Sequence, residues 1–116
     1  MPDVPVLYGA LMARVATIVS GTTKAGKREE LFALFKQHLA PRAEKNPNQP
    51  VVVWLADQGD ANAFHLFEIY SDPAAMEENS KAEWFWAYVS IAAPLLDGQP
   101  VMKMAAPRWA KGVEIG

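Results

Sequence analysis

The sequence contains no cysteine, and this absence excludes several chemistries at once. Without a thiol the chain has no disulfide framework, no thiolate nucleophile and no sulfur-ligated metal or cluster. Only two histidines are present. Because His38 and His65 are far apart and neither has a carboxylate at ligand spacing, we expect no bound metal. We interpret each histidine as a surface residue or a hydrogen-bonded structural residue.

A cluster of lysine and arginine is also missing, and the formal net charge of −2 argues against a nucleic-acid partner. There is no glycine-rich phosphate loop and no G-x-S-x-G motif. The apolar run that begins at Val4 resembles the core of a signal peptide, but Asp3 precedes it where a positive charge is needed. Arg14 interrupts the run before it could span a bilayer. We therefore predict a cytoplasmic protein with no membrane partner.

The 116 residues fit a single domain, 1–116, with a core of about 13–106 and a C-terminal tail over 107–116. Apolar residues make up 51% of the chain and charged residues 21%, the balance of a soluble globular protein. The pattern leaves open whether the segment from Val4 to Gly9 adds an edge strand or crosses to a partner chain.

Hydrophobic periodicity indicates four strands and two helices. A helix of about four turns begins near Lys27, and Pro41 is expected to end or kink it. A second helix begins at Asp72–Pro73, a favoured N-cap and first helical residue, and runs toward Leu96 with a break near Asn79–Ser80. The predicted strands are 13–20, 51–56, 63–71 and 99–106.

This order predicts an α+β fold, the ferredoxin-like β-α-β-β-α-β domain. Right-handed crossovers place both helices on one face of a four-stranded antiparallel sheet. The second and third strands are apolar on both parities, so the uncovered face would expose a large apolar patch. We therefore predict a homodimer through that sheet face. Whether Met102 and Met104 line a pocket or the dimer interface is left open.

Glu68 lies in the middle of an apolar strand, on the same parity as Phe64, Leu66 and Tyr70. An isolated buried charge is too costly, so this carboxylate must be paired, neutral through a raised pKa, or exposed to a polar pocket. It is either a structural anchor that joins strand to helix, or a general base or substrate contact.

Four tryptophans are present, and two of them, Trp84 and Trp86, are two residues apart on a predicted helix. They point about 200° apart, so both cannot face the core. Phe85 and Tyr88 belong to the expected core stripe. One tryptophan should therefore cap a pocket mouth or contact the partner chain.

The third-strand segment FHLFEIYSDPAA, the basic segment AGKREEL at the first helix and a last strand after DGQP together resemble the antibiotic biosynthesis monooxygenase family. The resemblance covers about residues 13–106. It implies a dimeric α+β barrel with a pocket in each subunit between the sheet and its helices. Some members oxygenate quinols or polyphenols without flavin, haem or metal, because the deprotonated substrate itself reduces dioxygen.

The resemblance implies a cofactor-independent monooxygenase that acts on a quinol or hydroxylated aromatic and uses no cofactor. A non-catalytic ligand-binding dimer is the alternative, and a haem-degrading relative is less favoured. Asn79 stands where relatives often carry histidine, and its amide can donate to an oxyanion; its other interpretation is a helix break or cap. The expected catalytic residues are Asn79 and Glu68, and the expected pocket walls are Trp54, Tyr70, Trp84, Phe85 and Tyr88.

Overall fold

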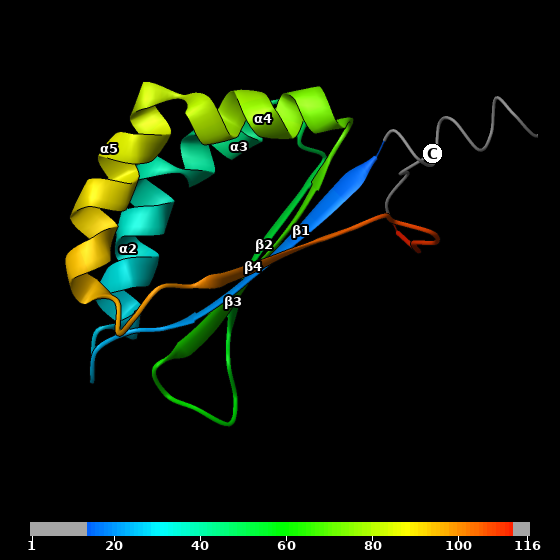
Figure 1. Cartoon of the computed structure of the whole chain (residues 1–116). Helices are drawn as coiled ribbons and strands as arrows, with labels where there is room; N and C mark the ends of the chain where they lie inside the picture. Colours follow the sequence, from blue (N-terminus) through cyan, green and yellow to red (C-terminus); the bar gives the residue numbers. More distant parts are fainter. Residues whose placement is uncertain (1–13, 113–116) are drawn as a thin grey trace, which may run out of the picture.

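A computed structural model describes residues 14–112, so the segment from Val4 to Gly9 lies outside the described residues. The predicted element order is confirmed (Figure 1). No helix within 14–112 is long and apolar enough to cross a membrane. The elements are β1 (Val15–Thr22), α2 (Arg28–His38), α3 (Ala40–Lys45), β2 (Val51–Ala56), β3 (Ala63–Tyr70), α4 (Pro73–Lys81), α5 (Glu83–Ala92), the short 3-10 helix η1 (Ala93–Leu95) and β4 (Val101–Ala105).

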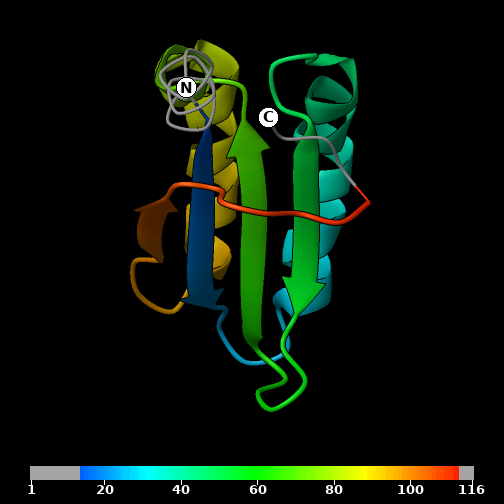
Figure 2. The ribbon, with the colours of Figure 1, turned by 90° about the vertical axis from the view of Figure 1, so that its right-hand side faces the viewer.

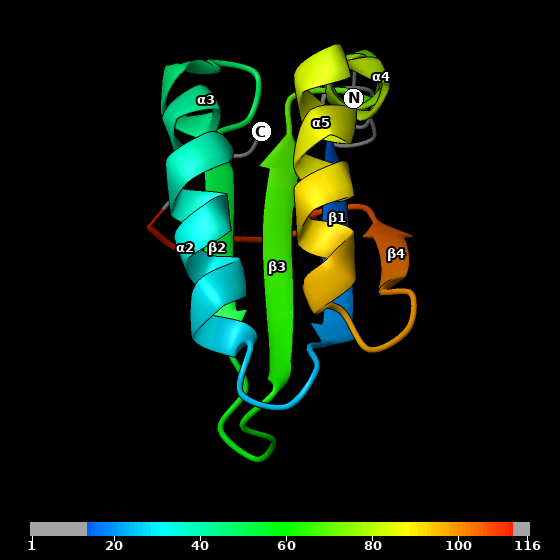
Figure 3. The same ribbon diagram turned by 90° about the vertical axis from the view of Figure 1, so that its left-hand side faces the viewer.

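The four strands form one antiparallel sheet in the order β2-β3-β1-β4. All the α-helices lie on the same face of this sheet, with α2 over β2 and α5 over β1 (Figures 1 and 3). The predicted ferredoxin-like α+β fold is therefore confirmed. The register places Val15, Thr17 and Val19 on the helix-covered face, alternating with Ala16, Ile18 and Ser20 on the open face.

Both expected helix interruptions are present, and the second lies further along the chain than predicted. Pro41 falls in the first turn of α3, just after α2 ends. The proline therefore separates two helices, as expected for a residue that cannot continue α2. Asp72 caps α4, its side chain accepting the Ala75 N–H at 2.8 Å. The break between α4 and α5 lies at Ala82, which is extended, and not at Asn79–Ser80. There the Trp86 indole donates to the Ser80 carbonyl at 2.9 Å, satisfying a C-terminal group of α4.

The main core lies between α2, α5 and the sheet. Leu31 is 2% exposed, and it packs with the buried Phe64 and Ala92. Gly21 of β1 allows this packing, because a Cβ there would lie 2.9 Å from the Phe64 ring. The ring of Trp54 stacks on Phe64 with centroids 5.7 Å apart, so it is part of this core. The partly buried side chains around it are Trp54, Tyr88, Leu95 and Leu96.

The open face of the sheet carries apolar side chains, as the strand parities predict. Ile18, Val53 and Leu55 are 38%, 41% and 45% exposed. The segment 106–112 crosses this face in front of β1, β3 and β2 (Figure 2). Its Ala110 packs against the cluster of Ala16 and Ile69. Residues 106–112, which include the described part of the predicted C-terminal tail, thus form a strap that covers only part of the apolar surface.

Candidate functional site

Glu68 lies on the helix-covered face of β3 at the centre of a polar cluster. Its Oε1 accepts a hydrogen bond from the Thr17 hydroxyl at 3.1 Å. Its Oε2 accepts one from the Gln49 amide at 2.5 Å and one from the Tyr70 hydroxyl at 2.9 Å. Within residues 14–112 no lysine or arginine pairs with this carboxylate. Three neutral donors from two strands and a loop therefore satisfy a largely buried acid.

Burial raises the pKa of Glu68 above its usual value, and this effect outweighs the three hydrogen bonds, which lower it. Burial also raises the pKa of Tyr70 well above its usual range, and the charge of Glu68 adds to the effect. Tyr70 therefore stays protonated and donates to Glu68. A raised pKa makes the Glu68 carboxylate a stronger base than an ordinary carboxylate, and therefore a candidate proton acceptor.

Replacing Glu68 with glutamine should remove a pH-dependent loss of stability. Because the folded protein holds this proton to a higher pH than the unfolded chain, wild-type stability falls as pH rises above about 4.5. The fall ends once pH exceeds the folded pKa. Urea unfolding between pH 4 and 8 should show the wild type losing stability relative to E68Q across this window. The exposed variant Glu83→Gln is the control, and a difference that grows in favour of the wild type would contradict the assignment.

Asn79 connects the Glu68 cluster to a surface cavity. Its side-chain amide lowers the pKa of the Tyr70 hydroxyl, an effect smaller than the opposite effects of burial and of the Glu68 charge. The same side chain lines a cavity of about 330 Å³ between α3, α4 and the Asn46–Asn48 loop. That volume lies within the range of small-molecule sites. Side chains that line the cavity include Arg42, Lys45, Asn48, Glu78, Asn79 and Trp84.

The structure brings some of the predicted site residues together and separates others. Asn79 and Trp84 line the cavity, Asn79 influences the pKa of Tyr70, and the Tyr70 hydroxyl donates to Glu68. Trp54 and Tyr88 pack into the core instead, and burial raises the pKa of Tyr88 to about 12. Phe85 lies between the two neighbouring tryptophans in edge-to-face contacts with ring centroids 6.3 and 5.6 Å apart. Met102 and Met104 are exposed on the edge strand β4.

Of the two tryptophans that cannot both face the core, Trp84 borders the cavity and Trp86 is 56% exposed. Asn79 is not the break between the helices, since its carbonyl accepts the N–H of the extended residue Ala82. The Glu68 side chain joins β3 to β1 and to the loop before β2. It is therefore an anchor between strands and a loop, and not the anchor between strand and helix that the sequence suggested.

A second cavity of about 430 Å³ lies on the other side of the Asn46–Pro47 loop. Gln49 lines this cavity and donates to Glu68, so the Glu68 cluster connects to both cavities. Val52 and Phe35 contribute apolar side chains to its wall.

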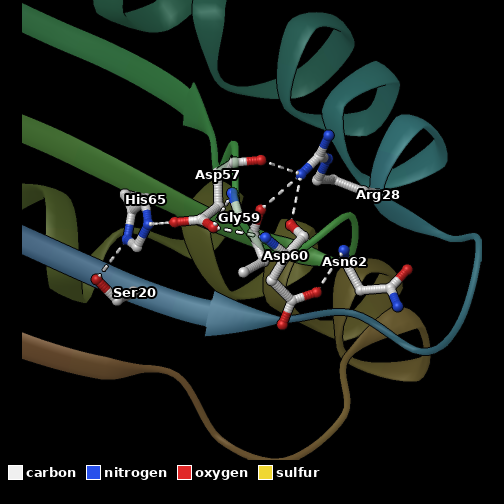
Figure 4. Close-up of polar contacts among 8 residues, drawn as sticks. Ser20, Arg28, Asp57, Gly59, Asp60, Asn62 and His65 are labelled. Atoms are coloured by element: carbon white, nitrogen blue, oxygen red, sulfur yellow. Dashed lines mark hydrogen bonds and ion pairs between the residues drawn. The ribbon is translucent and has the colours of Figure 1, made fainter.

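His65 belongs to a separate network on the open face (Figure 4). Its Nδ1 lies 2.8 Å from the Ser20 hydroxyl, and its Nε2 lies 2.8 Å from an Asp57 carboxylate oxygen. The hydrogen bond with His65 lowers the pKa of Asp57. The carboxylate also accepts hydrogen bonds from the N–H groups of Asp60 and Gly59, and these lower the pKa further. The interpretation of His65 as a hydrogen-bonded structural residue is confirmed, and the network holds the β2–β3 hairpin.

Arg28 anchors the same hairpin to the start of α2. Its Nη1 donates to the carbonyls of Asp57, Asp60 and Ala63 at 2.9 to 3.1 Å (Figure 4). His38 is exposed on α2. Across the described part of the chain, no group of three or more His, Asp or Glu side chains could hold a metal ion.

Comparison with known proteins supports the fold by structure alone. No family model and no curated protein sequence matches the chain. Among solved structures, a candidate antibiotic biosynthesis monooxygenase from Caulobacter crescentus superimposes with a TM-score of 0.78 at 14% identity, covering 90% of this chain and 99% of that one. A similar candidate from Chloroflexus aurantiacus gives 0.74 at 17% identity, covering 90% and 100%.

A third similar structure is an asparagine-to-alanine variant of SnoaB from Streptomyces nogalater, a cofactor-independent oxygenase. It gives a TM-score of 0.74 at 14% identity and covers 86% of this chain and 98% of that one. The chain therefore has the fold of the antibiotic biosynthesis monooxygenases, and the resemblance seen in the sequence is confirmed at the level of the fold.

Four residues of the site were not predicted from the sequence. Thr17 and Gln49 complete the Glu68 cluster, and both are buried polar side chains. Arg42 and Lys45 supply positive charge to the cavity. Arg42 and Lys45 follow Pro41 and are three residues apart. This spacing was the available signal, because it places both side chains on one side of a short helix.

Proposed function

We propose that the chain is a cofactor-independent monooxygenase that oxygenates a quinol or hydroxylated aromatic compound with dioxygen. The observation that carries this proposal is the position of Asn79, which lines the cavity and also lowers the pKa of Tyr70, the donor to Glu68. A site of this kind needs a group that binds the substrate oxygen and a base that receives its proton.

The substrate ring lies against Trp84, and its hydroxyl faces the Asn79 amide. A proton that leaves this hydroxyl reaches Glu68 through Tyr70, which accepts it while passing its own proton to the carboxylate. The Asn79 N–H then stabilises the substrate oxyanion. Glu68 suits the role of acceptor because burial raises its pKa and no cation pairs with it among the described residues.

The electrons for the reaction come from the substrate. The ring anion transfers one electron to dioxygen, and the two radicals combine at a hydrogen-bearing ring carbon ortho or para to the oxygen. The peroxide anion takes back the proton held by Glu68, and the hydroperoxide that forms loses water to give a quinone. One oxygen atom enters the product and the other becomes water, so a hydroxylated arene and one dioxygen yield one quinone and one water. This reaction needs no flavin, haem or metal, because the electron-rich anion takes the place of a redox cofactor.

We also propose that the working form is a homodimer that pairs the open sheet faces. The support is the exposure of Ile18, Val53 and Leu55 on this face, which the 106–112 strap covers only in part. A second copy would bury these side chains in a self-complementary contact with two-fold symmetry. The cysteine-free composition is compatible with the reducing cytoplasm, where we place the protein.

Oxygen uptake tests the reaction. In metal-free buffer with chelator, the protein should consume dioxygen with at least one member of a panel of naphthols and naphthoquinols, above the rate of autoxidation without protein. Labelled dioxygen should place one label in the quinone. Thermal stabilisation by the same compounds without uptake would support the ligand-binding alternative and contradict the monooxygenase. If no compound of the panel causes oxygen uptake or thermal stabilisation, both the monooxygenase and the ligand-binding alternative are contradicted.

A further inference from the structure

Two cationic side chains of α3 border the cavity beside an aromatic ring. The Arg42 guanidinium carbon lies 4.6 Å from the centre of the Trp84 ring, a cation–π contact that joins α3 to α5. Lys45 lines the same cavity one turn further along α3. A guanidinium stacked on a ring keeps the N–H groups at its edge available for a planar anion.

Neither cation forms an ion pair within residues 14–112. Of the described residues that line this cavity, Glu78 is the one acid, so the two cations leave a formal excess of one positive charge. The other polar groups of the wall are the neutral amides of Asn46, Asn48 and Asn79. The cavity therefore offers an aromatic surface, an amide and an uncompensated cation within one small volume.

We propose that this cavity selects aromatic compounds that carry a carboxylate next to the reacting hydroxyl. This inference rests on the proposed function for the role of Asn79 as the partner of the hydroxyl. The ligand ring lies along Trp84, its carboxylate binds Arg42 and Lys45, and its hydroxyl faces Asn79. A carboxylate suits Arg42 because the guanidinium presents two parallel N–H donors to its two oxygens.

The test compares two ligands of nearly equal shape, 1-hydroxy-2-naphthoate and its neutral analogue 1-hydroxy-2-naphthamide. Binding is measured by calorimetry without oxygen, so that no turnover occurs. The carboxylate should bind roughly tenfold more tightly at low salt, because charge-assisted hydrogen bonds are stronger than neutral ones. Raising the ionic strength should reduce this preference, since the cations are exposed.

The variants assign the preference to its residues. Arg42→Gln should reduce the ratio of the two affinities below about twofold, Arg42→Lys should retain part of it, and Lys45→Gln should lower it by a smaller amount. Lys24→Gln removes an equal charge from the β1–α2 loop and should leave the ratio unchanged. Circular dichroism verifies that each variant is folded. Equal affinities in the wild type, or a preference that survives in Arg42→Gln, would overturn the proposal.

The outcomes separate this inference from the proposed function. Oxygen uptake is measured with uncharged naphthols as well as carboxylated ones, whereas the affinity ratio is measured without oxygen. A carboxylate preference without uptake supports the binding inference and contradicts the monooxygenase. Oxygen uptake with uncharged substrates, together with no preference for the carboxylate, supports the monooxygenase and contradicts the binding inference.

Discussion

Replacing Asn79 with leucine should lower kcat/KM for oxygenation roughly 100-fold, because it removes the donor to the substrate oxyanion. Leucine is close to asparagine in size, so the cavity wall and α4 keep their shape. The loss should fall mainly on kcat, since the donor acts most strongly as charge develops on the oxygen. Steady-state oxygen uptake over a range of substrate concentrations separates the two parameters.

Ser80→Ala is the matched control for this variant. Ser80 is next in sequence but is exposed, and its hydroxyl donates to the Glu77 carbonyl. It should retain activity within about twofold of the wild type. An Asn79→Leu protein with full activity would remove Asn79 from the reaction, and the position would then be structural.

Replacing Val53 with glutamate should convert the proposed dimer to monomer. Val53 lies midway along the edge strand β2 on the open face, paired with Phe67 of β3, and it is 41% exposed in the single subunit. In a two-fold interface each substitution occurs twice, and an unpaired buried charge costs about 3 kcal/mol or more, which weakens association at least roughly 100-fold. Sedimentation velocity over a concentration series measures this change.

Ile91→Glu provides the control for the dimer test. Ile91 is 43% exposed, nearly the same as Val53, but it lies on α5 on the opposite side of the sheet. This variant should stay dimeric. Dissociation by Ile91→Glu and not by Val53→Glu would place the interface on the helices, and a monomeric wild type at micromolar concentration would contradict the dimer altogether.

The element order was predictable because each signal was local. Asp72 and Pro73 specify the start of α4, Pro41 separates α2 from α3, and short, largely apolar runs locate β2 and β3. The position of the second break was not predictable, because it depends on the extended backbone of Ala82 and on the bond from the Trp86 indole to Ser80. No sequence signal marks alanine as a helix end.

The site was predictable only within single elements. Strand parity correctly placed Glu68 and Tyr70 on one face, since residues two apart point the same way. The donors Thr17 and Gln49 come from other segments, and their positions depend on the strand register and the path of a loop. The place of Trp54 in the core likewise follows from its stacking on Phe64, a cross-strand contact that a single sequence does not specify.

The location of the substrate site is the central claim, and the four tryptophans allow a direct test. Nitrogen-15 correlation spectra resolve four indole N–H signals and the side-chain amide of Asn79, with Trp84→Phe assigning the indole of interest. Titration with 1-hydroxy-2-naphthoate without oxygen should shift the signals of Trp84 and Asn79 most, and that of Trp109 least. Large shifts at Trp54 with none at Trp84 or Asn79 would place the ligand elsewhere and contradict the site.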